Sequence, residues 1–422
     1  MKLYKGTKNR IHKRNRSCIG FMCILICCCL KLGQSWSIAA HNSIVSRNNR
    51  CSQLCQQSSS LRVEVSSDKA TIERNQQKIL VCGDGDLSFS AFMSNETMKT
   101  SDDTLLFATV LEDRTTHQSV YKGSVHNERL ILQNGHQVHF GIDATKLPSH
   151  FPNQLFARIQ FNFPHWKGKA NHRYNRQLIQ AFFQSASSML TPDGRIYIAL
   201  IENQGGANCT SLQEYRDTWT PSMFAAEYGL LLFDVQPFRV SYNLSSHRGV
   251  DRGFQIGKHP KLFIYGKPNQ NTPIQKQYQL CCRHELHIVL PSDHDINQVH
   301  DSDYSYSDIV HGNAIQSIIQ SIVPHGIAVH VPVRSLLKKD ETGYAHDMAV
   351  FLIVYCGETH PMKRNEADHY RHLTEMEVER YVPLRENRRG RLVSRPFPYY
   401  LLDHTIENHT RPSNTKILSN EQ

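Results

Sequence analysis

Short apolar runs alternate with amphipathic segments between residues 78 and 267. The apolar runs predict five strands, at Lys78–Cys82, Leu105–Leu111, Gln137–Ile142, Ala157–Phe161 and Arg195–Ile201. Tyr174–Leu190 carries apolar residues at helical spacing, which predicts a helix packed on the sheet, with Thr191–Gly194 as a turn. A helix at Pro221–Tyr228 and strands at Leu230–Val235 and Leu262–Tyr265 follow. This order predicts a doubly wound α/β fold, whose mainly parallel sheet ends in an antiparallel edge.

A second patterned region covers residues 280–400. Strands are predicted at Arg283–Leu290, Ile327–Val333 and Met348–Cys356, with a helix at Ser307–Ile322. The order β-α-β-β is compatible with a smaller α+β module, with a ferredoxin-like fold as one option. Arginines precede Phe397-Pro398-Tyr399-Tyr400, and this segment either contacts RNA or forms a solvated tail that continues through residues 401–422.

The N-terminal 40 residues have the composition of a targeting segment. Lys2–Arg16 is basic, Ile19–Leu30 is apolar, and small residues follow at Ser37-Ile38-Ala39, as in a signal peptide. A misassigned start codon is the alternative. The apolar run is shorter than the ~20 residues of a membrane span, so we predict no membrane partner for the folded part. Residues 41–77 are polar and predict a disordered linker before the domain at 78–267.

Charge and cysteine content exclude little beyond this. Eight of the Lys and Arg residues, and no Asp or Glu, fall in the first 32 residues, so most of the net charge of +10 is an N-terminal property. Nucleic-acid binding must therefore be argued from local patches. The 12 cysteines lack paired C-x-x-C spacing, and we predict neither a disulfide framework nor a metal site.

A glycine-rich turn follows the first predicted strand. Gly83, Asp84, Gly85 and Asp86 precede Ser88-Phe89-Ser90, where Ser88 or Ser90 is expected to cap a helix. Strand, glycine turn and helix open a nucleotide-binding βαβ unit, although a tight connection is the alternative. At the end of the second strand, Glu112 or Asp113 is placed to bind a ribose diol, unless this is a solvated strand end.

Asp143, at the end of the third strand, is an acceptor for an adenine amino group or a helix N-cap.

The fourth strand runs into an unusual turn, Asn162-Phe163-Pro164-His165-Trp166. An amide, a constrained proline turn and flat rings at one sheet edge suit a nucleobase that has left its helix. Phe163, His165 or Trp166 is expected to stack on that base. Four basic residues then follow that could neutralise phosphates: Lys167, Lys169, Arg173 and Arg176. A turn before a solvated basic helix start is the alternative.

These segments together resemble the eukaryotic 25S rRNA (uridine-N3) methyltransferase-like domain family. The resemblance rests on Ile79–Ser90, Ile142–Leu147, Phe161–His165, Gly168-Lys169 and, more weakly, on Arg176, Phe182-Phe183 and Pro192–Gly194. It covers about residues 77–267. It implies a Rossmann-like class I methyltransferase fold, S-adenosylmethionine as cofactor, ribosomal RNA as partner and uridine N3 as target.

The resemblance also assigns roles to residues. It implies that Gly83 and Gly85 lie near the methionine part of the donor, that Glu112 or Asp113 holds the ribose, and that Asp143 holds the adenine. It implies that Asn162–His165 face the base. Departures occur at Leu87, where the family has an aromatic residue, at Lys167, where it has glycine, and in Val240–Gly249, which keeps His247 and Arg248 as candidate RNA contacts. The last two departures put the RNA target in question more than the donor.

Methyl transfer to uridine N3 requires the loss of a proton. His165 is the one side chain of the turn that titrates near neutral pH, so it acts either as the base or only as a stacking surface, while Asn162 orients the uracil carbonyl edge. The alternatives are a dehydrogenase, an inactive RNA-binding protein and a methyltransferase acting on another RNA. The resemblance implies a cytoplasmic or nucleolar protein, and a functional signal segment would direct it to an organelle.

Overall fold

The computed structural model describes residues 76–100, 103–166, 171–239, 242, 245–246, 250–253, 256–269, 274–290, 312–337, 346–381 and 395–403. Three predicted segments lie outside the described residues: the targeting segment, the linker as far as residue 75, and the tail after residue 403. So do Lys167, Lys169, His247 and Arg248. Among the helices in the described ranges, none has the length and apolar character needed to cross a membrane.

The first domain is built on a seven-stranded sheet of order β3-β2-β1-β4-β5-β9-β6. Its strands are β1 (Gln77–Cys82), β2 (Thr104–Thr109), β3 (Gln137–His139), β4 (Phe156–Asn162), β5 (Leu190–Leu200), β6 (Leu231–Pro237) and β9 (Lys261–Gly266). The pairs among β1 to β5 are parallel, whereas β9 pairs antiparallel with both β5 and β6. The predicted α/β fold with a mainly parallel, Rossmann-like sheet is confirmed.

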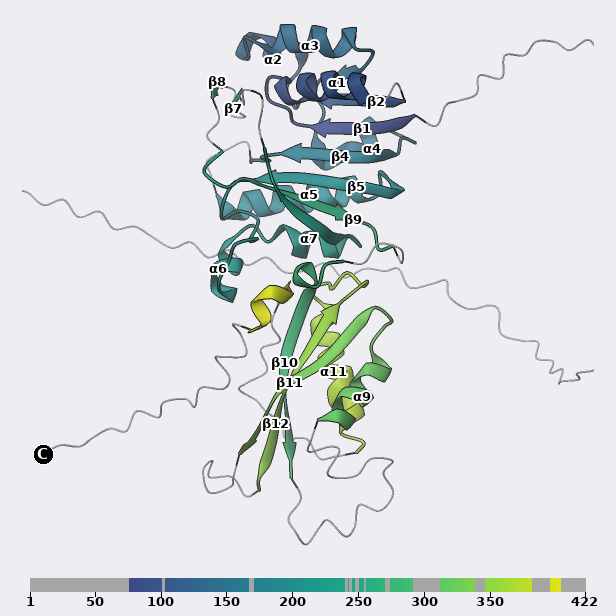
Figure 1. Cartoon of the computed structure of the whole chain (residues 1–422), viewed down its shortest axis with the longest axis vertical. Helices are drawn as coiled ribbons and strands as arrows, with labels where there is room; N and C mark the ends of the chain where they lie inside the picture. The colour runs from purple at the N-terminus through teal and green to yellow at the C-terminus, as the bar shows by residue number, and fades with distance from the viewer. Residues whose placement is uncertain are drawn as a thin grey trace, which may run out of the picture. The chain divides into compact units, whose positions relative to one another are not determined.

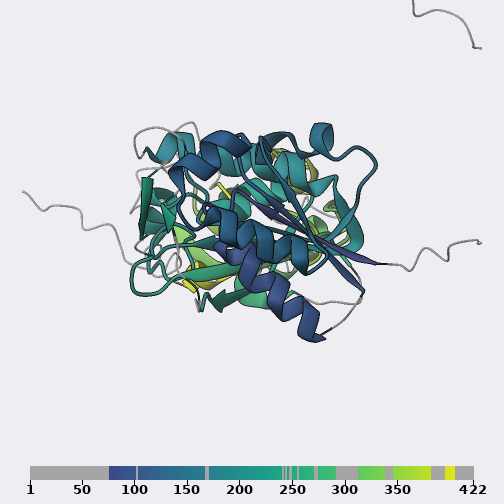
Figure 2. The same cartoon turned by 90° about the horizontal axis from the view of Figure 1, so that it is seen from above.

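Helices cover both faces of this sheet (Figures 1 and 2). They are α1 (Ser88–Thr100), α2 (Arg114–Val120), α3 (Ser124–Gln133), α4 (Leu147–His150), α5 (His172–Ser187), α6 (Leu212–Asp217) and α7 (Pro221–Glu227). A small hairpin, β7 (Ser245–Ser246) with β8 (Val250–Gly253), lies apart from the sheet.

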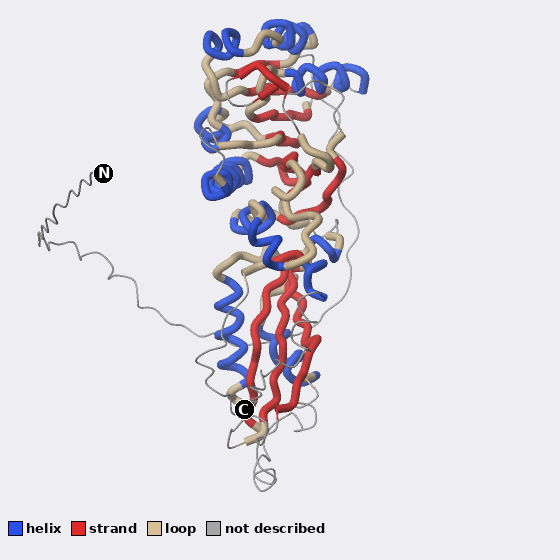
Figure 3. The backbone as a smooth tube through the Cα atoms, turned by 90° about the vertical axis from the view of Figure 1, so that its left-hand side faces the viewer, coloured by secondary structure: helices blue, strands red, loops and turns tan. Residues whose placement is uncertain are grey.

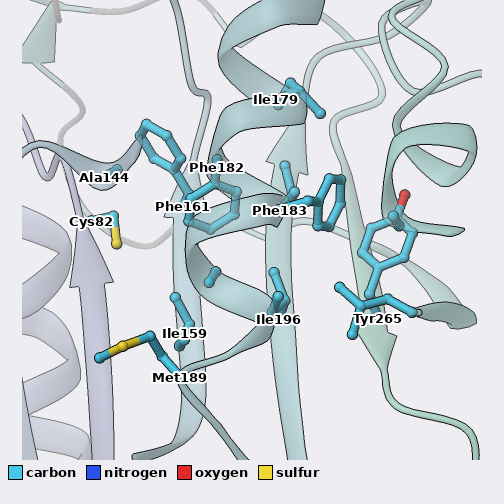
Figure 4. Packing of buried hydrophobic residues seen from close by; sticks show 14 of the residues in the cluster. Cys82, Ala144, Ile159, Phe161, Ile179, Phe182, Phe183, Met189, Ile196 and Tyr265 are labelled. Carbon is cyan, nitrogen blue, oxygen red and sulfur yellow. The ribbon is translucent and has the colours of Figure 1, made fainter. Parts of the chain in front are cut away.

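The alternation of side chains along the central strands sorts them to the two faces. On one face, Phe161 and Ile196 pack with Phe182 and Phe183 of α5 in the largest buried cluster (Figure 4). On the other face, Val81, Leu106 and Ala199 pack with Phe89 of α1. The sheet is therefore buried on both sides, as expected for parallel strands that read as continuous apolar runs.

The expected antiparallel edge is confirmed, because β9 and β6 pair antiparallel at the end of the sheet, with β6 as the outermost strand. One expectation about this sheet was wrong. Thr191–Gly194 is not a separate turn before the fifth strand, because β5 begins at Leu190. The β4–β5 register jumps from Phe156↔Leu190 to Arg158↔Arg195, so these residues bulge out of the strand pairing.

The second domain contains a four-stranded sheet of order β11-β12-β10-β13. Its elements are β10 (Leu280–Val289), α9 (Asn313–Ile322), β11 (Ile327–Leu337), β12 (Met348–Gly357), α11 (Glu366–Val378) and β13 (Phe397–Pro398). The ladders recorded for this sheet are antiparallel, and the chain order is β-α-β-β-α-β, so the fold is ferredoxin-like. Figure 3 shows its long strands beside the helices.

The sequence pattern had identified four of these six elements and missed α11 and β13. It also misread the aromatic segment at Phe397–Tyr400. Phe397 is 1% exposed and packs with Cys281 and Leu401, so its ring fills the core and does not stack on RNA. Residues Tyr215 and Met223 of the first domain belong to the same buried cluster, and the Tyr400 hydroxyl donates to the Gly206 carbonyl.

Candidate functional site

The carboxyl ends of the parallel strands are tied together at one edge of the first sheet. The Asp84 amide, after β1, donates to the Thr109 carbonyl of β2 at 3.1 Å, and the Val110 amide donates to the His139 carbonyl of β3 at 3.1 Å. The Phe163 amide, after β4, donates to the Ala199 carbonyl of β5 at 2.8 Å. These bonds place the glycine turn and the start of the Asn162 turn along the edge where ligands bind in open α/β sheets.

The glycine turn requires glycine at position 83. Gly83 has φ +59°, and a Cβ there would lie 2.9 Å from the Phe161 ring. A side chain at this position is therefore both conformationally strained and sterically blocked. Leu87, which departs from the family pattern, also has positive φ, at +67°, and its side chain is fully buried. Such strain in a non-glycine residue is typical of functional turns.

Carboxylates cap helix α1, and not the serines that the sequence suggested. Asp84 accepts from the Phe89 and Ser90 amides at 3.3 and 2.6 Å, and Asp86 accepts from the Ser88 amide at 3.1 Å. Burial raises the pKa of Asp84 to about 6, against the lowering effect of its bonds to Ser90. The start of the helix thus holds a carboxylate whose ionised form lacks full solvation.

Two side chains that the sequence analysis did not identify hydrogen-bond to the backbone carbonyls of this turn. The His117 ring, fully buried, bonds through Nε2 to the Gly85 carbonyl at 2.6 Å, and the Asn127 amide donates to the Asp86 carbonyl at 2.9 Å. A carbonyl only accepts, so His117 carries its proton on Nε2. Their sequence signal is weak because both residues lie more than 30 positions from the turn.

Two of the predicted acidic contacts serve as helix caps. Asp113 accepts from the Thr116 amide at 2.9 Å and from the hydroxyls of Thr115 and Thr116. These hydrogen bonds, and the one from the Thr115 hydroxyl most of all, lower the pKa of Asp113. Asp143 accepts from the amide and hydroxyl of Thr145 at 2.9 and 2.7 Å, as in the capping alternative. Glu112 is partly exposed, and its side chain is in neither of these caps. Of the two candidates for the ribose, Glu112 is therefore the better placed.

Asn162 is the last residue of β4, and the Nδ2 donor of its side chain lacks a well-formed hydrogen bond. Its Oδ1 accepts from Gln160 Nε2 at 2.7 Å, while its Nδ2 is buried. The buried Tyr242 hydroxyl lies beside this amide and near Asp84 and Asp86. Burial raises the pKa of Tyr242, the two carboxylates raise it further, and hydrogen bonding from the Asn162 side chain lowers it. Its ring packs against Phe89 and Phe92, with centroids 5.4 and 5.9 Å apart.

The aromatic residues of the turn divide into buried and accessible rings. Phe163, which has φ +48°, is 7% exposed and packs edge-on against Phe238 at 5.2 Å, so it does not offer a stacking face as proposed. Pro164 is also buried. Trp166 is 40% exposed and stacks on Tyr174 at 5.4 Å.

His165 Nδ1 lies 2.9 Å from the Trp166 carbonyl, which only accepts. The proton of a neutral His165 ring therefore sits on Nδ1, and its basic lone pair is on Nε2.

Two of the predicted phosphate contacts can be placed. Arg173 is exposed near the start of α5, after the capping residue Asn171. Arg176 instead directs its guanidinium to the carbonyls of Arg216 and Thr218, with Nε donating to Thr218 at 2.9 Å. This bonding links α5 to the last turn of α6 and to Thr218 directly after it, so Arg176 has a structural role that its charge alone did not reveal.

The sequence matches a known family over this domain. Residues 80–247 match the family described as "BMT5-like: rRNA (uridine-N3-)-methyltransferase BTM5-like". This segment is similar to the BMT5-like family. The resemblance seen in the sequence is thereby confirmed for the first domain, and the cofactor of such methyltransferase domains is S-adenosylmethionine.

Two curated relatives each match part of the chain. Human ferredoxin-fold anticodon-binding domain-containing protein 1 is 34% identical over 187 residues, and its mouse homolog is 32% identical over 190 residues. Each match covers 43% of this chain and 29% of the relative, so the chain spans under a third of their length.

Solved structures give a weaker likeness. TrmN from Thermus thermophilus is 16% identical, with coverage of 45% of this chain and 44% of that chain and a TM-score of 0.28. The glycopeptide N-methyltransferase MtfA, solved with S-adenosylmethionine, is 10% identical, with coverage of 47% and 84% and a TM-score of 0.29. At these TM-scores the likeness supports no inference.

Proposed function

We propose that this chain is an S-adenosylmethionine-dependent RNA methyltransferase whose target is N3 of a uridine in ribosomal RNA. The observation that supports it most is the segment similar to the BMT5-like family, whose glycine turn and Asn162 turn lie along one ligand-binding edge. The name of the family supplies the uridine target, and a methyltransferase acting on another RNA remains the second candidate within the same chemistry.

The residues of the edge suit the donor. Gly83 lets the turn adopt positive φ against the Phe161 ring, and Glu112 offers a carboxylate for a ribose. Asp84, with its pKa raised to about 6 by burial, lies beside Asp86 and gains from a nearby positive charge. S-adenosylmethionine carries a sulfonium and an ammonium group, so its charge complements this pair of carboxylates.

When bound, the donor supplies a sulfonium methyl group that an in-line nitrogen lone pair can attack. The chain's own residues prepare that nitrogen. Asn162 Nδ2 donates to a carbonyl oxygen of the base and so fixes its orientation. His165, with its lone pair on Nε2, accepts the N3 proton as the N–C bond forms, and Trp166 offers an exposed face for stacking.

Transfer of a labelled methyl group tests this proposal. Purified protein is incubated with S-adenosylmethionine and ribosomal RNA, and the modified nucleotides are identified by mass spectrometry. We expect 3-methyluridine, and a product without methyl label would contradict the proposal. His165→Gln should lower the rate by about 10²-fold or more if the ring is the base. His172→Gln, an exposed histidine at the start of α5, is the matched control and should leave the rate unchanged.

The second domain supports a further RNA contact. The human relative is named for a ferredoxin-fold anticodon-binding domain. Residues 280–398 of this chain have the ferredoxin-like topology. We infer that this domain binds RNA and helps to deliver the substrate. Gel-shift titration of the whole chain with transfer RNA and with single-stranded ribosomal fragments tests it, and absence of binding to either would reject this role.

A further inference from the structure

Three polar residues follow one another on a single face of β4. Arg158, Gln160 and Asn162 alternate with Ile159 and Phe161, so they share the face that α1 covers, beside Ile79 and Val81 of β1. Gln160 is 1% exposed in this otherwise apolar region. Burying an amide costs free energy unless its donors and acceptors are hydrogen-bonded, so the hydrogen-bond partners of Gln160 are needed for it to be stable at this position.

The bonds among these residues run in one direction. Arg158 Nε donates to Gln160 Oε1 at 2.9 Å, and a second guanidinium nitrogen donates to the same oxygen. Gln160 Nε2 then donates to Asn162 Oδ1 at 2.7 Å. The Arg158 guanidinium also lies over the Tyr197 ring, 4.2 Å from its centroid, which holds the start of the row in place.

The chemistry of arginine fixes the orientation of both amides. A guanidinium has donors and no acceptor, so Gln160 must turn its oxygen toward Arg158 and its NH₂ toward Asn162. Asn162 must then turn Oδ1 back along the strand, which leaves Nδ2 at the carboxyl edge. Because Arg158 at the start of the row can only donate, it determines the orientation of both amides.

We propose that Arg158 and Gln160 are positioning residues that fix the polarity of Asn162, so that the site accepts a base with a carbonyl oxygen beside the reacting nitrogen. This inference rests on the proposed function and names the residues that set its preference for uridine. Uracil offers such an oxygen on either side of N3. Cytosine offers an amino group on one side of N3, and that donor would face the Asn162 donor.

The Asn162 Nδ2 donor determines how strongly the site prefers uridine over cytidine. Asn162 Nδ2 is buried beside the Tyr242 hydroxyl and makes no hydrogen bond of good geometry within the described residues. A base that leaves it unpaired keeps the desolvation cost, whereas a carbonyl oxygen removes it. Discrimination of about tenfold or more against cytidine is the expected size for one such hydrogen bond.

Gln160→Glu reverses the polarity. The carboxylate accepts from both sides, so Asn162 would turn its NH₂ toward residue 160 and its oxygen toward the edge. Two RNA oligonucleotides that differ only in uridine or cytidine at the target are compared as substrates. We expect the wild-type ratio of transfer to favour uridine and the variant ratio to fall by about tenfold or more. Gln137→Glu, an exposed change on β3, should leave the ratio unchanged.

A second variant and a binding measurement keep the test decisive if Gln160→Glu fails to fold. Asn162→Asp offers only acceptor oxygens at the edge and should shift the ratio in the same direction. The affinities of uridine and cytidine monophosphate are measured by NMR titration of each protein. An unchanged ratio in folded variants would overturn the inference.

If the wild-type protein transfers methyl to no RNA, the proposed function fails separately. The mononucleotide ratio then decides alone: a preference for uridine monophosphate that the variants lose supports the row of residues, and equal binding rejects it.

Discussion

Each of the two sheets contains a buried nitrogen without a well-formed hydrogen bond. In the first domain it is Asn162 Nδ2, at the carboxyl end of β4. In the second it is the ring of His284, in the middle of β10, where both nitrogens are unpaired and the ring stacks on Tyr355 at 5.6 Å. Asn162 is oriented by the bonds from Arg158 and Gln160 and lies at the edge where we propose that a ligand binds, whereas His284 lies among buried side chains. An unpaired buried group therefore points to a binding site only where its position allows a ligand to reach it.

The largest expected effect is on the affinity for S-adenosylmethionine, when the glycine turn at the proposed binding edge is changed. Gly83→Ala should weaken binding of S-adenosylmethionine by about 10²-fold, because positive φ and the Phe161 ring both oppose a Cβ. Isothermal calorimetry measures it. Gly135→Ala is the matched control, since Gly135 also has positive φ, at +77°, but no atom within 4 Å of its Cβ. Equal loss in both variants would trace the effect to backbone strain alone.

Removal of the two unmet groups should separate activity from packing. Asn162→Ala should reduce the rate constant of methyl transfer by about 10²-fold, because orientation of the base is lost. His284→Phe should leave that rate unchanged, because its ring stacks in the second domain. Single-turnover rates with a uridine oligonucleotide measure both, and a comparable loss in His284→Phe would erase the distinction drawn between them.

His284 should make the second domain sensitive to acid. Burial, with the nearby charge of Arg371, lowers its pKa to about 3, below the ordinary value of 6.5. Between these values the unfolded chain binds a proton that the folded chain does not, so stability is full above pH 6.5 and falls as the pH drops toward 3. At pH 5 the cost is about 2 kcal/mol. His284→Phe should flatten this dependence in thermal melts, and an unchanged slope would show that other groups cause it.

The smallest effect concerns Asp84. Its pKa of about 6 means that the carboxylate gains a proton as the pH falls from 7 to 5 and loses its attraction for a cationic donor. Affinity for S-adenosylmethionine should therefore fall by about tenfold at most over this interval. Asp84→Asn should bind more weakly at pH 7 and show little pH dependence. Calorimetry at both pH values compares the two proteins, and parallel pH profiles would exclude Asp84 as the titrating group.

Much of the first domain could be predicted from sequence because its signals are local. The apolar runs, the turn at Gly83 and the Asn162 turn each lie within a few residues. The capping serines were misassigned because Asp84 and Asp86 offer stronger acceptors at the same helix start. The row on β4 was missed, although polar residues at every second position of a buried strand are a readable pattern.

The second domain was harder to predict because its defining pieces are short or distant. β13 is two residues long and includes Pro398, which removes a ladder donor and disguises the strand. Its pairing with β10, through Leu280↔Pro398 and Cys281↔Phe397, joins residues more than 110 positions apart. Local periodicity does not contain such a pairing.

The late position of β13 also sets an order for synthesis on the ribosome. The strands of the first sheet that the structure records are all complete by Gly266, so that sheet can close while the rest of the chain is still being made. The second sheet keeps one side of β10 uncovered until Phe397 emerges. During that interval the nascent chain presents an unpaired strand edge, and this is where chaperone binding or misassembly would begin.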